Sequence, residues 1–183
     1  MTTSGWPMSS IDFVPLPAEA LELMLRDDLR GAGTLVGVEL PEFFLQEKWL
    51  WRIRRDQLRD APEAAPWLVR AAVLVEDGSV VGHAGFHGPP DGDGAVEVAY
   101  TVVPSRRGEG LSHRLLRALL DEAAASPDVE VARASISPDN LPSLAVARRA
   151  GLEHVGEQWD EEDGRELIFE LDVSSRTDDE SQR

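Results

Sequence analysis

The residues best suited to chemistry lie in one segment that combines a strand, a glycine-containing loop and an apolar helix. This segment, Val96–Leu116, reads VEVAYTVVPSRRGEGLSHRLL. Gly108 and Gly110 let backbone N–H groups approach a ligand closely, and the N-terminus of the following helix adds partial positive charge. Arg106 and Arg107 add two full positive charges beside the glycines. The segment is therefore predicted to hold a phosphate or a pyrophosphate.

The better-known phosphate motifs are missing from the sequence. Neither G-x-x-x-x-G-K-[ST] nor G-x-G-x-x-G occurs, and the absence of G-x-S-x-G removes support for serine hydrolase chemistry. An ordinary strand-to-helix turn with exposed arginines has the same composition. The loop composition alone leaves both interpretations open.

Two blocks of sequence resemble the GNAT superfamily of acyl-CoA-dependent N-acyltransferases. Arg107–Ser112 (RGEGLS) is similar to the family's R-x-x-G-x-(G/A) pyrophosphate loop, with Ser112 where Gly or Ala is usual. Asn140–Ser143 (NLPS), followed by Ala150–Leu152 (AGL), resembles N-x-x-S…(K/A)-G-(F/L) of the branch that includes ribosomal-protein N-terminal acetyltransferases. Two blocks in the expected order are more specific than either alone.

The resemblance implies that acetyl-CoA is a co-substrate, held between the strands Ala95–Val103 and Val129–Ile136. Its pyrophosphate would lie on the amides of residues 107–112 and its pantetheine along the first of these strands. An N–H near Thr101 would polarise the thioester carbonyl. The residues predicted to bind acetyl-CoA are Thr101, Val102, Val103, Arg106, Arg107, Gly108, Glu109, Gly110, Leu111, Ser112 and Asn140.

Acetyl transfer to an amine needs a base, because an α-amino group with a pKa near 8 is mostly protonated at about pH 7. Glu97 is the only charged residue in Ala95–Val103. Strand alternation places it on one face with the small Ala99 and Thr101. It also matches the position of a catalytic glutamate in many family members. A solvent-facing glutamate on a half-exposed sheet is the alternative.

The proton donor to the leaving thiolate is less well defined. Many relatives have a tyrosine in the last short helix, at the position that is Ala147 here. The one tyrosine of the chain, Tyr100, is predicted on the strand face opposite Glu97. Ser143 matches the serine of the second block and is predicted as the second catalytic residue, which would hydrogen-bond the sulfur. A helix cap is the alternative for both Ser143 and Asn140.

Hydrophobic periodicity predicts a single mixed α/β domain around one central sheet. The resemblance to the family implies that this sheet is mixed, mostly antiparallel and flanked by helices. Residues 1–10 are expected to be a flexible N-terminus, 11–173 the GNAT-like domain and 174–183 a disordered acidic tail. The predicted helices cover a stretch from Ala18 that stops at Gly31 and Gly33, then 41–60, Leu111–Ala125 and 141–150. The predicted strands are Ile11–Leu16, Val69–Val75, Val80–Phe86, Ala95–Val103, Val129–Ile136, 153–159 and 165–173.

Composition narrows the partners. The 183 residues have a net charge of −16 and no cysteine, which excludes disulfides and argues against nucleic-acid and anionic-membrane binding. Residues 104–151 hold seven basic and six acidic side chains, so the predicted anion site escapes the acidity of its flanks. Those flanks suit a cationic acceptor. His83 and His87 lie on a predicted strand and are about 13 Å apart, so no metal site is expected.

The sequence thus predicts a bacterial, cytoplasmic enzyme that acetylates a primary amine by direct attack in a ternary complex. The acceptor is a protein N-terminus or a small amine, and a homodimer is open because dimers are common in the family. Two alternatives remain, namely a non-catalytic acyl-CoA-binding module and an acyltransferase for a longer acyl-CoA.

Overall fold

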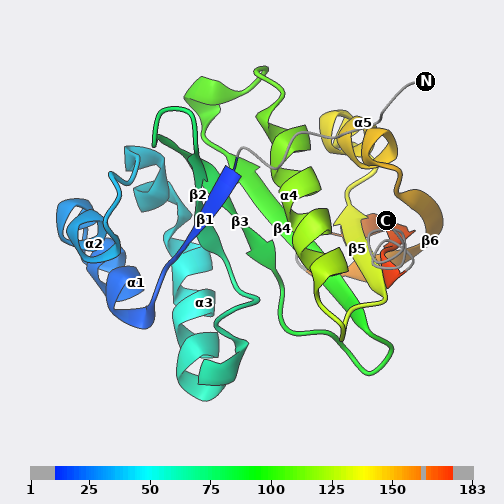
Figure 1. Cartoon of the computed structure of the whole chain (residues 1–183), viewed down its shortest axis with the longest axis horizontal. Helices are drawn as coiled ribbons and strands as arrows, with labels where there is room; N and C mark the ends of the chain where they lie inside the picture. The colour runs from blue at the N-terminus through cyan, green and yellow to red at the C-terminus, as the bar shows by residue number, and fades with distance from the viewer. Residues whose placement is uncertain (1–10, 162–163, 175–183) are drawn as a thin grey trace, which may run out of the picture.

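The computed structural model describes residues 11–161 and 164–174, which form one seven-stranded sheet with helices on both faces (Figure 1). The strand order is β1-β2-β3-β4-β5-β7-β6, and every neighbouring pair is antiparallel except β4 and β5. This arrangement confirms the predicted fold class. The strands are β1 Ile11–Pro15, β2 Arg70–Leu74, β3 Val80–Phe86, β4 Ala95–Val102, β5 Val131–Ile136, β6 Glu153–Asp160 and β7 Gly164–Asp172. The α-helices are α1 Ala18–Leu25, α2 Leu29–Val36, α3 Lys48–Asp60, α4 Leu111–Ala125 and α5 Leu141–Ala150.

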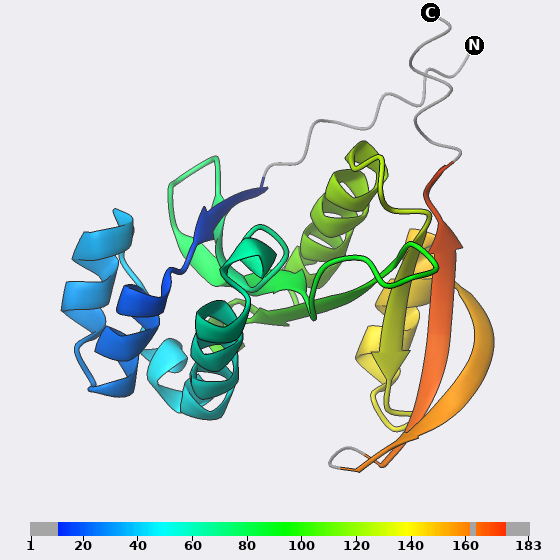
Figure 2. The ribbon, with the colours of Figure 1, turned by 90° about the horizontal axis from the view of Figure 1, so that it is seen from below.

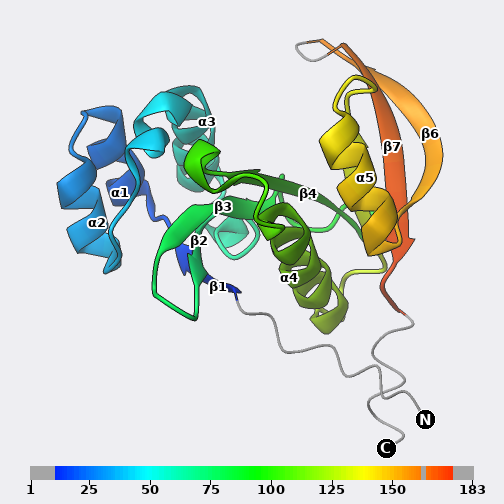
Figure 3. The ribbon, with the colours of Figure 1, turned by 90° about the horizontal axis from the view of Figure 1, so that it is seen from above.

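Two apolar clusters fix the helices on opposite faces of the sheet. In β2, Ala72 and Leu74 belong to the cluster under α4 and α5, whereas Ala71 and Val73 belong to the cluster under α1, α2 and α3. This is the period-2 alternation expected of a strand covered on both sides. Figure 3 shows α4 and α5 on one side of the sheet and α1–α3 on the other.

β4 and β5 separate along their length. They pair only over Ala95–Glu97 and Val131–Arg133, although β4 continues to Val102 and β5 to Ile136. β5 goes on pairing with β7, so the strands β5, β7 and β6 turn away together from β1–β4 (Figure 2). The last five residues of β4 therefore have no strand partner on this side, and those of their backbone groups that point away from β3 face a gap.

The helix predicted from Ala18 is divided in two, and the prediction that it stops at Gly31 and Gly33 is wrong. Asp27 has a φ of 65° and ends α1, and the Asp28 side chain caps α2 by accepting a 2.8 Å hydrogen bond from the Gly31 N–H. A Cβ on Gly33 would lie 2.7 Å from the Val38 carbonyl oxygen. The chain folds back so closely onto this position that only glycine fits there, although Gly33 lies inside α2.

The segment predicted as one helix over 41–60 begins instead with a 3₁₀ helix, Glu42–Glu47, before α3. The Trp51 indole N–H donates a 2.5 Å hydrogen bond to the Phe44 carbonyl, which an α-helix would use internally. The other predicted elements are present, with ends that differ by at most two residues. The predicted tails 1–10 and 174–183 lie outside the described residues, apart from Ser174.

Within residues 11–161 and 164–174, the helices are too short or too polar to span a bilayer.

Candidate active site

The loop between β4 and α4 has the backbone form that the sequence predicts for an anion site. Gly108 and Gly110 have φ values of 85° and 77°, a region that side chains with a Cβ avoid. Gly110 is the N-cap of α4 and offers no side chain to its first N–H groups. A Cβ at either glycine would have nothing within 4 Å, so both border open space. The first turn of α4 can accept an anion there.

The two arginines of this loop are held differently. The Arg106 Nε lies 2.8 Å from a Glu109 carboxylate oxygen, and one of its amino groups donates to the Ser79 hydroxyl at 3.3 Å. Arg107 donates from Nε to the Val102 carbonyl at 3.3 Å. Glu109 therefore neutralises part of the charge of Arg106, and Arg107 is the cation without a carboxylate among the ion pairs of the described loop.

The pairing of β4 with β3 decides which amides face the gap. The His87 N–H bonds the Glu97 carbonyl, and the Val103 N–H bonds the Val81 carbonyl, both at 2.9 Å. Opposed residues in an antiparallel ladder alternate between bonded and non-bonded pairs. Thr101 lies an even number of residues from both Glu97 and Val103, so its backbone groups point toward β3.

The amides that face the gap are consequently those of Tyr100 and Val102. Arg107 bonds the Val102 carbonyl from that side, which agrees with this assignment. The Thr101 N–H is thus directed away from the predicted acetyl-CoA site, although its side chain lines the adjacent cavity. Val103 also turns its N–H to β3, so of the predicted run 101–103 only Val102 presents its amide to the gap.

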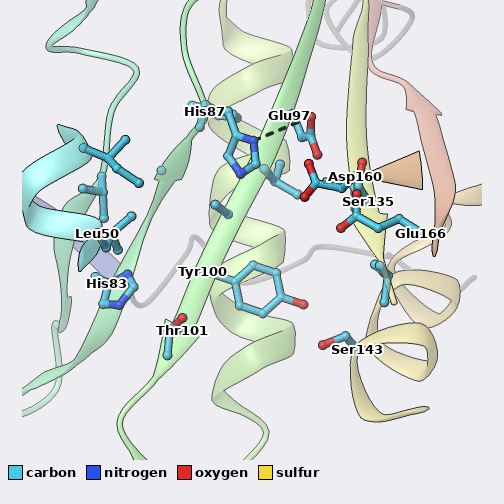
Figure 4. A pocket seen from close by; sticks show the side chains of 18 of the residues that line it. Leu50, His83, His87, Glu97, Tyr100, Thr101, Ser135, Ser143, Asp160 and Glu166 are labelled. Carbon is cyan, nitrogen blue, oxygen red and sulfur yellow. Dashed lines mark ion pairs between the residues drawn. The ribbon is translucent and has the colours of Figure 1, made fainter. Parts of the chain in front are cut away.

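A cavity of about 770 Å³ extends through the point where the two strands separate. Its walls come from α3, β3, β4, β5 and α5, and from the last residues of β6 and first of β7. Figure 4 shows Glu97 and His87 at one end and Tyr100 and Ser143 farther along. The structure therefore brings the predicted Glu97, Thr101, Asn140 and Ser143 to one cavity, whereas the predicted loop residues Arg106–Ser112 are not among those that line it.

Glu97 faces the cavity together with His87. The His87 Nδ1 and a Glu97 carboxylate oxygen are 3.7 Å apart, and the Glu97 side chain keeps 27% of its surface accessible. Glu97 is the one carboxylate of β4. It can accept a proton from a ligand in the cavity and pass it to His87 or to water.

The cavity has an apolar side on α3 and an acidic side on β6 and β7. α3 contributes Trp49 and Ile53, which are 56% and 45% exposed. Across from them, Asp160 of β6 and Glu166 of β7 present carboxylates (Figure 4). Sequence reasoning missed Asp160 and Glu166, because the turn that joins β6 and β7 reads simply as an acidic hairpin.

Buried basic groups lie under the same region. His83 is 4% exposed, is surrounded by Phe43, Phe44 and Trp51, and has its Nε2 3.8 Å from a Glu47 carboxylate oxygen. That nitrogen has no hydrogen-bond partner among the described residues.

Arg54 donates to the Gln57 amide oxygen at 2.7 Å and to the His87 carbonyl at 3.2 Å. Burial lowers the pKa of the Arg54 guanidinium below its usual value. Arg54 therefore fixes the end of β3 against α3.

Asn140 and Ser143, from the second sequence block, have different roles at the start of α5. The Asn140 side chain is the helix cap and accepts a 3.2 Å hydrogen bond from the Ser143 N–H, as the capping alternative expects. Ser143 is not the cap, and its side chain lines the cavity (Figure 4). Ala147, one turn farther, lines it too and is 1% exposed. No group of three or more His, Asp or Glu within the described ranges is arranged to hold a metal ion.

Comparison with known proteins agrees with this geometry. The sequence profile of a family described as acetyltransferase (GNAT) domain matches residues 38–153. The chain belongs to the GNAT family of acetyltransferases. A phosphinothricin N-acetyltransferase of Streptomyces coelicolor is 31% identical to this GNAT acetyltransferase over 121 residues, which are 64% of this chain and 70% of the relative.

Solved structures share the fold of this GNAT acetyltransferase. AAC(6')-Ib in complex with ribostamycin and coenzyme A has a TM-score of 0.62 and 19% identity, with 92% of this chain and 97% of that chain covered. The ribosomal-protein-S5-alanine acetyltransferase of Vibrio fischeri has a TM-score of 0.61 and 14% identity, with 92% and 96% covered. Their names point to different kinds of amine acceptor, so at this level of identity they show the shared fold and do not select an acceptor.

Proposed function

We propose that this protein transfers the acetyl group of acetyl-CoA to a primary amine by direct attack in a ternary complex. The observation that carries the proposal is one cavity at the point where β4 and β5 separate. Glu97 lines this cavity, and so does the unpaired part of β4, which leads into the loop before the uncapped first turn of α4. A co-substrate with a pyrophosphate on that turn would extend its pantetheine along β4 and its acyl group toward Glu97. Residues 107–112, Val102 and Tyr100 would bind it through backbone amides.

The chemistry needs little else from the chain. The neutral amine nitrogen forms a bond to the thioester carbonyl carbon, the C–S bond breaks, and its electron pair leaves with sulfur. Glu97 takes the proton that the amine loses. The N–H groups of Tyr100 and Val102 are the donors on β4 that can polarise the carbonyl, because both face the gap.

The acceptor we propose is positively charged, either a protein N-terminus or a small amine such as an aminoglycoside or a polyamine. Glu97, Asp160 and Glu166 place three carboxylates on one cavity, and these attract an ammonium group. Trp49 and Ile53 offer apolar contact to the rest of the acceptor. An amino acid with a second anionic group suits this lining less well.

A screen of coenzyme A release tests the proposal. Acetyl-CoA is offered with peptides that have free N-termini, lysine peptides, aminoglycosides, polyamines and phosphinothricin, and the free thiol is measured. We expect release that depends on a cationic acceptor, and acetyl-CoA to be preferred over succinyl-CoA and malonyl-CoA. Tight binding of acetyl-CoA without release in any mixture would favour a non-catalytic binding module instead.

A further inference from the structure

Tyr100 enters the cavity although its strand face points it away from Glu97. Its neighbours on that face, Val98 and Val102, are 7% and 5% exposed and pack under α4. Tyr100 lies beyond the point where β4 and β5 stop pairing, and it lines the cavity. Figure 4 shows the ring pointing across the gap, with its hydroxyl on the side where Ser143 lies.

The helix on the far side of the gap offers room for this ring. α5 presents Ser143 and Ala147 to the cavity, and neither side chain is large. The resemblance to the family implies a phenol at position 147, where this chain has only a methyl group. The one tyrosine of the chain thus lines the same cavity as Ala147, but it comes from β4.

The hydroxyl of Tyr100 is available as a donor. Its Oη makes no hydrogen bond with the described residues, and burial alone raises its pKa to about 12. A phenol with this pKa keeps its proton at any working pH. It is a weaker acid than a thiol with an ordinary pKa of about 8.5, so hydrogen-bond donation is favoured over complete proton transfer.

We propose that the Tyr100 hydroxyl donates a hydrogen bond to the sulfur of coenzyme A as the C–S bond breaks, in place of a phenol from α5. This inference rests on the proposed function. The electron pair of the broken bond stays on sulfur, where the Tyr100 O–H stabilises it. Water then protonates the thiolate, and the proton held by Glu97 returns to solvent, so the step leaves no net charge. Ser143 is the rival donor, because its hydroxyl lines the same part of the cavity.

Binding of coenzyme A and of desulfo-coenzyme A, which lacks the thiol, tests this assignment without catalysis. At about pH 9.5 most of the thiol is ionised. The unaltered protein is expected to bind coenzyme A more tightly than desulfo-coenzyme A. Tyr100→Phe is expected to lower the ratio of Kd for desulfo-coenzyme A to Kd for coenzyme A roughly tenfold or more. Ser143→Ala is expected to keep the ratio. In turnover, Tyr100→Phe lowers kcat and leaves KM for acetyl-CoA nearly unchanged.

A second measurement needs no variant. Because the chain contains one tyrosine, tyrosinate absorbance reports Tyr100 alone. Saturation with coenzyme A should move its alkaline titration to higher pH than saturation with desulfo-coenzyme A, since a thiolate beside the phenol opposes its ionisation.

The outcomes separate the two proposals. Equal titrations with both ligands, or a binding ratio lost in Ser143→Ala but kept in Tyr100→Phe, would overturn the role of Tyr100. Failure of both ligands to bind would instead overturn the acetyl-CoA site itself.

Discussion

Replacing Gly110 with alanine tests whether the left-handed glycine at the start of α4 serves a ligand. Gly110 has a φ of 77°, and an added Cβ would have no protein atom within 4 Å. The substitution therefore adds backbone strain without a clash, which costs about 1–2 kcal/mol of folding free energy. For a chain of this size that lowers Tm by about 2–8 °C.

The effect on coenzyme A should exceed this strain. The methyl group would lie in the open space in front of the first N–H groups of α4, where the proposed pyrophosphate binds. Loss of one charge-assisted hydrogen bond costs about 1.5–3 kcal/mol, so we expect Kd for coenzyme A to rise roughly tenfold to a hundredfold. Isothermal titration calorimetry of the folded variant measures this directly.

Gly37→Ala is the matched control. Gly37 has a φ of 79° at the end of α2, also with nothing within 4 Å of an added Cβ, and α2 lies far from α4 (Figure 1). It should lose about the same stability and keep its affinity for coenzyme A. If both variants bind coenzyme A as tightly as the unaltered protein, the assignment of the loop is refuted. If both bind it equally more weakly, backbone strain alone accounts for the loss.

Three further predictions concern the base Glu97, the ion pair between Arg70 and Glu122, and the effect of Tyr100 ionisation on stability. Glu97→Gln should leave coenzyme A affinity unchanged and lower kcat by about 10²–10⁴-fold, most strongly near neutral pH where the amine is protonated; an unchanged pH–rate profile would remove Glu97 from the mechanism. Glu122→Gln should lower the free energy of unfolding in urea by about 2–4 kcal/mol, because Arg70, which is 9% exposed, bonds the Glu122 carboxylate at 2.7 and 2.8 Å and would lose this charged partner. Glu157→Gln removes a carboxylate from an exposed ion pair and should cost less than about 1 kcal/mol, so equal losses in the two variants would contradict this reasoning. The free energy of unfolding should fall by about 2–3 kcal/mol between pH 10 and 12. In the unfolded state Tyr100 ionises near its ordinary pKa of 10.0, whereas burial raises its pKa in the folded state to about 12. Tyr100→Phe, measured alongside, should lack this part of the pH dependence.

Local patterns predicted the elements that hold the proposed co-substrate. The spacing of Leu111, Leu115 and Leu119 gives α4 with both ends correct, and the glycines before it have the left-handed backbone that an anion loop requires. These features depend on a few consecutive residues. Hydrophobic periodicity and glycine chemistry are therefore sufficient to predict them.

The rest of the site depends on contacts between distant segments. Tyr100 reaches the cavity only because β4 and β5 separate after Glu97, and no local pattern encodes that separation. Asp160 and Glu166 approach Glu97 because β7 pairs with β5, more than 30 residues earlier in the chain. Face alternation correctly separates Tyr100 from Glu97 but does not reveal that one cavity passes between the two faces.

A crystal structure of the protein with coenzyme A and a cationic amine is the most direct test of the account. We predict the pyrophosphate on the amides of residues 107–112 and the pantetheine along the unpaired part of β4. The sulfur should lie within hydrogen-bond distance of the Tyr100 hydroxyl, and the amine beside Glu97. Coenzyme A bound away from the gap between β4 and β5, or an amine on the opposite side of the sheet from Glu97, would contradict it.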